Sequence, residues 1–282
     1  MIRFLIFEIK KCAVNRYFLI VVSILIVFSF IDVVQVYNEY IVFQKSYQAE
    51  LNPAVESFSI YNSWLGGKNS GIIPTILYFL LPIYVALPFS WTYVEEYKSG
   101  YIKCAMILVK SRSKYYWGKY ISVFMSGMIM ILIPIITNLF MLGLFLKPYV
   151  PDIMWGLYYA VPEGMPFSKL FYTYPNIYLC VYIFIQSVFA GAWATMSLSI
   201  SFYVKNKITA ILAPYICLLF LVYIIEKMLV FKVWVEISPM NFIRGVVINN
   251  NSNVFIIFGT IALLIIISSV LTCVEIRRKD DY

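Results

Sequence analysis

Long apolar runs, separated by shorter polar segments, dominate the pattern of hydrophobic and polar positions along this chain. Six runs reach about twenty residues, the length that a helix needs to cross a hydrocarbon layer of about 30 Å. Each run is predicted to be helical, because a lipid-exposed strand would leave backbone polar groups unpaired. The six expected membrane spans cover residues 17–36, 72–94, 120–146, 177–204, 208–230 and 254–274.

Residues 1–16 precede the first span and have a different pattern. Their apolar residues recur at helical spacing, while Arg3 and Lys10 fall on the other side of the expected helix. The pattern predicts an amphipathic helix that lies on the membrane surface. The alternative is that this segment extends the first span. The apolar positions are Ile2, Leu5, Ile6, Ile9 and Ala13.

Three further segments between spans are less regular. Residues 38–71 are largely polar and are expected to form a loop. Residues 147–176 are rich in proline and aromatic residues, which favours an interfacial aromatic belt, with a ligand-stacking surface as the alternative. Residues 231–253 contain an apolar stretch too short to span, which predicts short re-entrant or interfacial helices.

The composition supports a single membrane domain over residues 1–282. Apolar residues make up 62% of the chain, charged residues only 13%, and the mean hydropathy is +0.83, values that exclude an ordinary soluble domain. Histidine is absent, which removes the commonest general base and metal ligand. A phosphate-binding GxxxxGK[ST] sequence is also absent. We therefore expect no catalytic residue, no metal site and no cofactor in this chain.

The distribution of the 22 Lys and Arg residues predicts the orientation. With both ends in the cytoplasm, 15 of them fall on the inner side and 7 on the outer side, as the retention of cations in the cytoplasm requires. The cations are spread along membrane boundaries, so the expected partners are anionic lipid headgroups or an acidic cytosolic protein. A single folded basic face, which a nucleic-acid partner would need, is not expected.

Polar residues inside the expected spans are few. Asp32 falls near a span end, where water is close. Asn138 and Gln186 lie deeper, and two interpretations remain open for both. Either they form hydrogen bonds between helices, or they line a substrate path.

The densest group of cations lies in the cytoplasmic segment 95–119. Within it, Ile102, Ala105, Met106 and Val109 fall at i, i+3, i+4 and i+7, the spacing of one helical face. This predicts a short amphipathic helix between the second and third spans. From the periodicity alone, its apolar face fits either a lipid surface or a groove on a soluble partner.

This segment resembles the signature of type-2 ATP-binding cassette (ABC) exporter permeases. In that family a Glu is followed four residues later by Gly-Thr, a coupling helix, a Pro-x-x-Arg turn and a Gly-Lys pair that opens the next span. Glu96, Gly100, Arg112 and Gly118-Lys119 match this order. The sequence departs from the pattern at two positions, with Tyr101 in place of Thr and Val109 in place of Pro.

The resemblance implies a multi-pass subunit of a bacterial cell membrane that is not itself an enzyme. It would pair with a second permease copy, identical or homologous, and with two cytosolic ABC ATPase subunits that hold ATP and Mg²⁺. Ala105 and Met106 would sit in the ATPase groove, while Glu96 and Arg112 would brace the ends of the coupling helix.

The expected cargo is an amphipathic or antimicrobial peptide. A lipid-linked glycan or a small drug is the alternative cargo. A non-transporting membrane scaffold or regulatory protein is the alternative from another functional class.

Overall fold

The computed structural model describes residues 2–50, 58–68, 71–109, 111–153, 159, 161–162, 164–204, 206–224, 239–246 and 253–278. Every regular element in these ranges is a helix, which confirms the all-α class there. The helices are α1 (Ile2–Ala13), α2 (Arg16–Glu50), α3 (Ile60–Ser63), α4 (Ile72–Phe79), α5 (Leu81–Ala86), α6 (Thr92–Lys98), α7 (Tyr101–Val109), α8 (Arg112–Leu142), α9 (Ser168–Thr173), α10 (Pro175–Ser201), α11 (Lys207–Tyr223), α13 (Pro239–Phe242) and α14 (Val254–Arg278).

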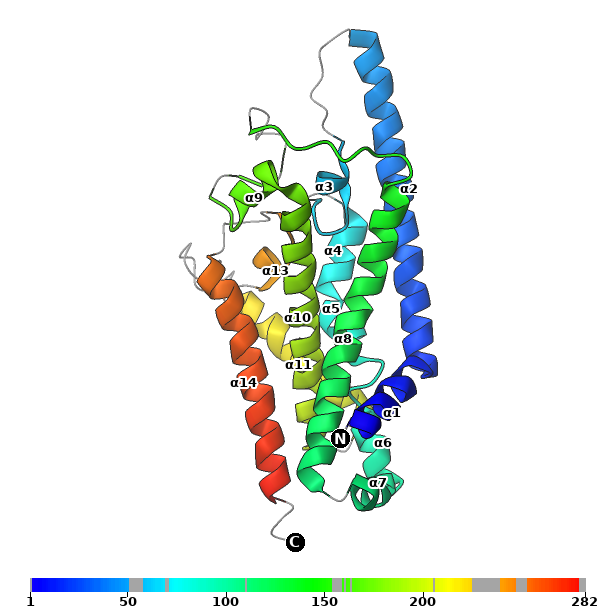
Figure 1. Cartoon of the computed structure of the whole chain (residues 1–282), viewed down its shortest axis with the longest axis vertical. Coiled ribbons are helices and arrows are strands. Elements are labelled where there is room, and N and C mark those ends of the chain that lie inside the picture. Colours follow the sequence, from blue (N-terminus) through cyan, green and yellow to red (C-terminus); the bar gives the residue numbers. More distant parts are fainter. Residues whose placement is uncertain are drawn as a thin grey trace.

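Four helices, α2, α8, α10 and α14, are long and apolar enough to cross a membrane. They run lengthwise through the molecule, with the shorter helices between and beside them (Figure 1). They correspond to the predicted first, third, fourth and sixth spans. The chain thus has the character of a membrane protein, while the full set of six spans stays a prediction.

The predicted second span, 72–94, is not one continuous helix. It forms α4, α5 and α6, with a break at Leu80 and a turn after Ala86. Pro82 explains the first break, because it lacks the N–H that would bond to the Tyr78 carbonyl and continue α4. The backbone N–H groups of Ile83 and Tyr84 instead bond to the Leu80 carbonyl and begin α5.

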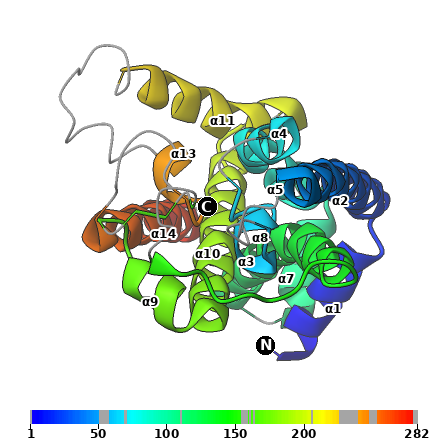
Figure 2. The same cartoon turned by 90° about the horizontal axis from the view of Figure 1, so that it is seen from above.

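The predicted fifth span, 208–230, corresponds in its described part to α11. Its 17 residues extend about 26 Å at 1.5 Å per residue, and residues 225–230 of the predicted span lie outside the described residues. α11 also lies steeply tilted against the long helices when the bundle is seen from above (Figure 2). Of the predicted re-entrant pair, the structure describes only 239–246, which contains α13; the remainder lies outside the described residues.

The N-terminal segment forms a helix of its own, as predicted, rather than an extension of the first span. The chain turns at Asn15, whose side-chain oxygen accepts a hydrogen bond from the Tyr17 N–H at the start of α2. The Asn15 amide also donates to the Pro88 carbonyl at 2.6 Å, which fixes this turn against the turn between α5 and α6. α2 is longer than predicted and continues to Glu50.

Helix α10 lies at the centre of the bundle, with α8, α14, α11 and α9 around it (Figure 2). α8 and α10 approach closely because small residues face each other. A Cβ added at Gly127 would lie 2.8 Å from the Ala190 carbonyl oxygen, and one at Gly191 would lie 2.9 Å from the Phe124 carbonyl oxygen. This contact holds the two central helices close together.

Residues 58–68 are predicted as part of a polar loop, but they are packed into the bundle. We call them the plug segment. Trp64 and Leu65 are fully buried, and the Leu65 N–H donates to the Asn138 side chain on α8 at 3.1 Å. On the other side, the Gly245 N–H donates to the Gly66 carbonyl at 2.8 Å. The plug segment therefore connects α8 with the segment that contains α13.

Candidate functional site: a buried charge cluster and the plug segment

Four charged side chains and one tyrosine meet where α1, α6 and α8 converge. We call Glu8, Lys11, Glu96, Tyr115 and Lys119 the charge cluster. Lys119 is fully buried, and its ammonium lies 2.6 Å from Glu96 Oε1 and 3.1 Å from Glu8 Oε2. The same ammonium sits 4.3 Å from the centre of the Phe89 ring, a favourable cation–π position.

Glu96 is the hub of the charge cluster. Besides Lys119, its Oε1 contacts the Lys11 ammonium at 2.5 Å, and its Oε2 accepts a hydrogen bond from the Tyr115 hydroxyl at 2.6 Å. Two carboxylates thus face two ammonium groups, so the charges balance. Such balance is necessary here, because a buried charge without a partner is strongly destabilising.

Local packing of α1 on α8 positions Glu8 in the charge cluster. Phe4, Glu8 and Cys12 are four residues apart and lie on one face of α1. The Phe4 ring packs 5.7 Å from the Tyr115 ring, and a Cβ added at Gly118 would lie 2.8 Å from the Phe4 ring. Gly118 therefore allows α1 to approach α8 closely enough for Glu8 to reach Lys119.

The charges of the cluster shift the pKa values of its members outside the long helices. Burial alone would raise the pKa of Glu96, but Lys119 and Lys11 outweigh it and lower this pKa below its usual value. Burial disfavours the charged form of Lys11, yet Glu96 outweighs that effect and raises the Lys11 pKa. Both groups are therefore ionised throughout the neutral range.

The predicted amphipathic helix between the second and third spans is present as α7. Gly100 separates it from α6 with a φ of +72°, a left-handed conformation that favours glycine over other residues. The Gly100 N–H bonds to the Tyr97 carbonyl and ends α6, while the Gly100 carbonyl accepts from Lys103 in α7. Glycine at this position thus permits the sharp change of direction between the two helices.

The apolar face of α7 was expected to meet a lipid surface or a soluble partner, but in the structure it packs against the chain itself. Ile102 and Ala105 are buried against the rest of the chain, and Met106 packs partly against the same core. The open side carries Lys103, Cys104 and Ile107, and Ile107 is 75% exposed. The remaining predicted contact residues lie at the end of α7 and the start of α8: Val109, which is half-buried, and Arg112, which is exposed.

Comparison with family models, with curated proteins and with solved structures returns no match to this chain. The role of Glu96, Gly100 and Arg112 in coupling therefore stays a prediction. Of these three, the structure brings Glu96 into the charge cluster, seats Gly100 at the junction of α6 and α7, and sets Arg112 as the first residue of α8.

A second group of buried polar residues surrounds the plug segment. Asn138 and Gln186, the predicted substrate-path residues, are both fully buried. The Asn138 amide donates to Asp32 Oδ2 on α2 at 2.9 Å, and the Gln186 amide donates to the Ile243 carbonyl at 3.0 Å. Asp32, expected near water, is also fully buried. These amides thus form hydrogen bonds between elements, and a role in a substrate path stays a prediction.

Among the described residues, several buried polar atoms around the plug segment form no hydrogen bond. An unmade hydrogen bond of this kind costs roughly 1–3 kcal/mol. The Arg244 guanidinium lies 5.2 Å from the centre of the Tyr78 ring. The atoms are Asp32 Oδ1, Trp64 Nε1, Tyr78 OH, Gln186 Oε1 and Arg244 Nε.

Sequence reasoning did not find the partners of Glu96. Glu8 is an acidic residue in an otherwise basic lead segment, and its spacing from Phe4 and Cys12 was the available signal. Within the described ranges, no group of three or more Cys, Asp and Glu side chains is placed to hold a metal ion. The charge cluster thus joins α1, α6 and α8 through ion pairs and one tyrosine hydrogen bond.

Proposed function

We propose that this chain is the permease subunit of an ATP-driven ABC exporter, served by two separate ATPase subunits and a second permease copy. One observation carries the proposal. α7 presents an exposed side while the helices on both sides of it, α6 and α8, are joined through Glu96 and Lys119. Force applied to α7 would therefore act on α8 directly.

The proposed transmission continues from α8 into the centre of the bundle. α8 contacts α10 at Gly127 and Gly191, so the two central helices would move together. Rigid-body motion of this kind needs contiguous packing and no catalytic residue. ATP binding and hydrolysis would take place in the ATPase subunits.

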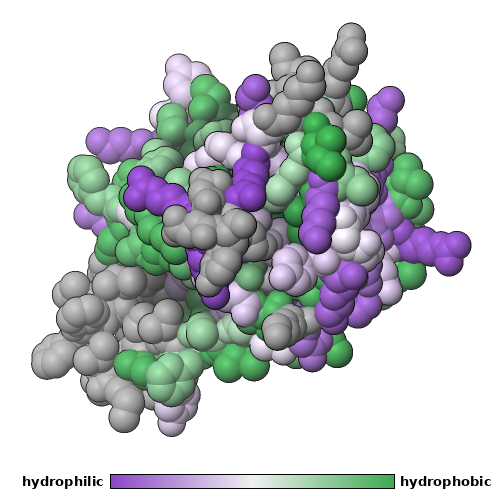
Figure 3. Space-filling model, turned by 90° about the horizontal axis from the view of Figure 1, so that it is seen from below, coloured by the Kyte–Doolittle hydropathy of each residue, from purple (hydrophilic) through white to green (hydrophobic). Residues whose placement is uncertain are grey.

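The position of α7 fits a soluble partner. It lies at the same end of the molecule as the C-terminal end of α14, and the N-terminal helix α1 is also near this end (Figure 1). Seen from that end, hydrophilic residues occupy much of the face and hydrophobic ones lie toward its edges (Figure 3). This distribution supports a cytoplasmic face on which α7 meets an ATPase.

An amphipathic or antimicrobial peptide is the proposed cargo. The aromatic residues near α9 pack on one another within the chain. The Phe171 ring lies edge-to-face against the rings of both Tyr172 and Tyr178. The buried polar groups around the plug segment are the internal region best suited to peptide backbone or termini. Peptide-stimulated ATPase activity of the reconstituted complex is the test, and activity indifferent to such peptides would contradict this cargo.

The coupling role is tested by changing the exposed side of α7. Ile107→Asp should abolish copurification of an ABC ATPase subunit, identified by its phosphate-loop and signature sequences, because a charge replaces the exposed apolar contact. Ile107→Leu should retain it. Val150→Asp is a matched control, since Val150 is exposed and lies after α8, at the opposite end of that helix from α7. Unchanged ATPase binding and activity in Ile107→Asp would overturn the proposal.

A further inference from the structure

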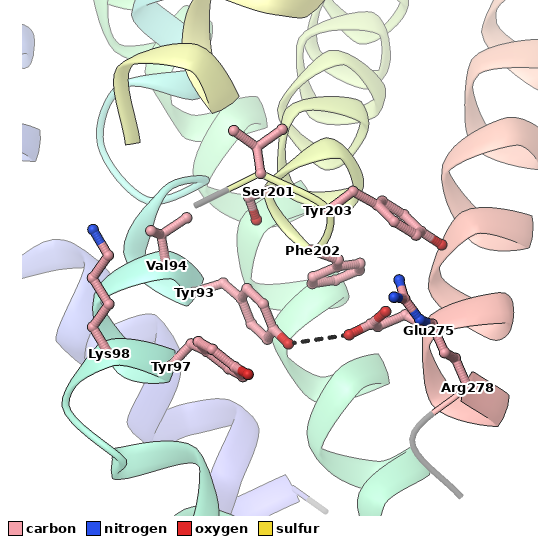
Figure 4. Close-up of a pocket in the computed structure, with 10 residues that line it drawn as sticks. Tyr93, Val94, Tyr97, Lys98, Ser201, Phe202, Tyr203, Glu275 and Arg278 are labelled. Carbon is pink, nitrogen blue, oxygen red and sulfur yellow. Dashed lines mark hydrogen bonds between the residues drawn. The ribbon is translucent and has the colours of Figure 1, made fainter. Parts of the chain in front are cut away.

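A pocket of about 370 Å³ lies between α6, the C-terminal end of α10 and the C-terminal end of α14. Figure 4 shows side chains from these three elements converging on it. The volume falls in the lower part of the range of about 300–1,000 Å³ that is typical of small-molecule sites. The pocket is separate from both the charge cluster and the plug segment.

The base of the pocket combines aromatic rings with a buried carboxylate. Tyr93 and Glu275 are both 2% exposed, and the Tyr93 hydroxyl donates to Glu275 Oε1 at 3.4 Å (Figure 4). The Phe202 ring stands edge-on to the Tyr93 ring at 4.7 Å. Aromatic rings beside a carboxylate are a typical environment for an organic ammonium group.

The rim of the pocket has the opposite charge. Lys98, at the end of α6, and Arg278, at the end of α14, are both exposed and line the opening. Guanidinium and ammonium groups are the usual partners of phosphate. The pocket thus offers a site for a positive group at its base and for a negative group at its rim.

A continuous apolar stripe on α14 leads to this rim. Ile266, Val270 and Val274 are exposed and four residues apart, and Arg278 follows at the same spacing. Residues spaced in this way lie above one another on a helix. The stripe therefore winds gradually around the C-terminal part of α14, by about 40° per step of four residues, and ends at a cation, where an acyl chain would meet its headgroup.

We propose that this pocket binds the headgroup of a zwitterionic phospholipid. The ammonium lies against Tyr93 and Glu275, the phosphate lies beside Arg278 at the rim, and an acyl chain follows the α14 stripe. The recognised chemistry is an ammonium linked to a phosphate, which soluble phosphoethanolamine shares. The stripe favours the lipid. The proposal does not depend on the transport function.

The test uses the purified full-length chain, delipidated in detergent. Binding of phosphatidylethanolamine, phosphatidylglycerol and soluble phosphoethanolamine is measured by native mass spectrometry and by the shift in thermal midpoint. Phosphatidylglycerol carries the phosphate without the ammonium. The variants are Glu275→Gln, which removes the charge at the base, and Arg278→Gln, which removes one at the rim. Arg277→Gln is the matched control, because Arg277 is exposed on the same turn but does not line the pocket.

Phosphatidylethanolamine should bind the unaltered chain about tenfold more tightly than phosphatidylglycerol, as expected for one charge-assisted contact. Glu275→Gln should abolish this preference, and Arg278→Gln should weaken binding of both lipids. Arg277→Gln should change neither. Arg278 is exposed, so its variant tests the site even if Glu275→Gln unfolds the chain.

Three results would overturn the proposal. One is equal affinity for the two lipids in the unaltered chain. Another is a loss of binding in Arg277→Gln as large as in Arg278→Gln, which would indicate a general attraction to cations. The third is binding of soluble phosphoethanolamine as tight as that of the lipid, which would assign the pocket to the free zwitterion.

Discussion

The Lys119 ammonium lies 2.6 Å from Glu96 Oε1, and both side chains are buried although 23 positions separate them in the chain. The residues between them form the end of α6, all of α7 and the start of α8. This ion pair therefore joins α6 to α8, the two helices on either side of α7. Its removal should affect both the stability of the fold and the connection between α7 and α8.

Breaking this pair should destabilise the protein strongly. Lys119→Met should reduce the free energy of unfolding by about 3–5 kcal/mol, because it leaves the carboxylate of Glu8 buried without its ammonium partner. Glu96→Gln should reduce it less, because Lys119 keeps its ion pair with Glu8 and the Lys11 side chain is 34% exposed. The double variant should lose less than the sum of the two, since the two side chains interact. Thermal unfolding in detergent, converted to free energies, gives the coupling energy directly.

Lys114→Met is the control for this cycle. Lys114 is exposed and lies on the same helix as Lys119, so its removal should change stability by less than about 0.5 kcal/mol. Additive losses for Lys119 and Glu96 would show that the pair contributes no interaction of its own.

Stability should depend on pH through Glu96. Its pKa is lowered in the folded chain from the usual 4.5, so its contribution is present above about pH 4.5 and is lost as the pH falls through the folded value. The pKa of Lys11 is raised above 10.5, so its contribution is present below that pH and is lost in stronger alkali. The thermal midpoint, measured as a function of pH, should fall on the acid side.

The acid part of this profile distinguishes Glu96 from its neighbour. Glu96→Gln should reduce the fall in thermal midpoint below about pH 4.5. Glu95→Gln should leave it unchanged, because Glu95 is more than half exposed and pairs only with the exposed Lys207 among the described ion pairs. An identical acid profile in the unaltered chain and in Glu96→Gln would assign the pH dependence to other carboxyl groups.

The periodicity of the sequence predicted those elements whose structure depends on neighbouring residues alone. α1 and α7 are amphipathic over short stretches, and the apolar runs of α2, α8, α10 and α14 are long enough to be recognised without any knowledge of packing. The break within 72–94 was not predicted, although Pro82 in the middle of the run was the available signal. A hydropathy pattern does not show that a proline interrupts the helix.

Contacts between distant residues could not be predicted in this way. Lys119 and Glu8 are 111 positions apart, and no local pattern indicates that α1 packs on α8. For the same reason, the apolar side of α7 was expected to be open to a partner, whereas the structure buries it. An apolar face such as that of Ile102 and Ala105 shows only that something covers it, and here the chain covers it with its own core.

The plug segment should tolerate no added side chain at its centre. A Cβ at Gly66 would overlap the Trp64 ring and lie 2.7 Å from the Gln186 amide nitrogen. Gly66→Ala should therefore cost about 1–3 kcal/mol of stability through overpacking, measured as a lower thermal midpoint.

Gly259 provides the matched control for this substitution. A Cβ at Gly259 in α14 would meet nothing within 4 Å, so Gly259→Ala should be neutral or stabilising by up to about 1 kcal/mol. Equal midpoints for Gly66→Ala and Gly259→Ala would show that the plug segment is not packed tightly in the folded protein.

The orientation of the chain can be tested through Cys104, which is exposed on α7. If both ends face the cytoplasm, a membrane-impermeant maleimide should label Cys104 in inside-out vesicles and not in intact cells. Cys180, also exposed, lies near the start of α10, so a Cys180→Ser background removes the thiol closest to the opposite face. Cys104→Ser in that background is the negative control. Labelling of Cys104 in intact cells would place α7 outside the cell and would exclude any contact with a cytosolic ATPase.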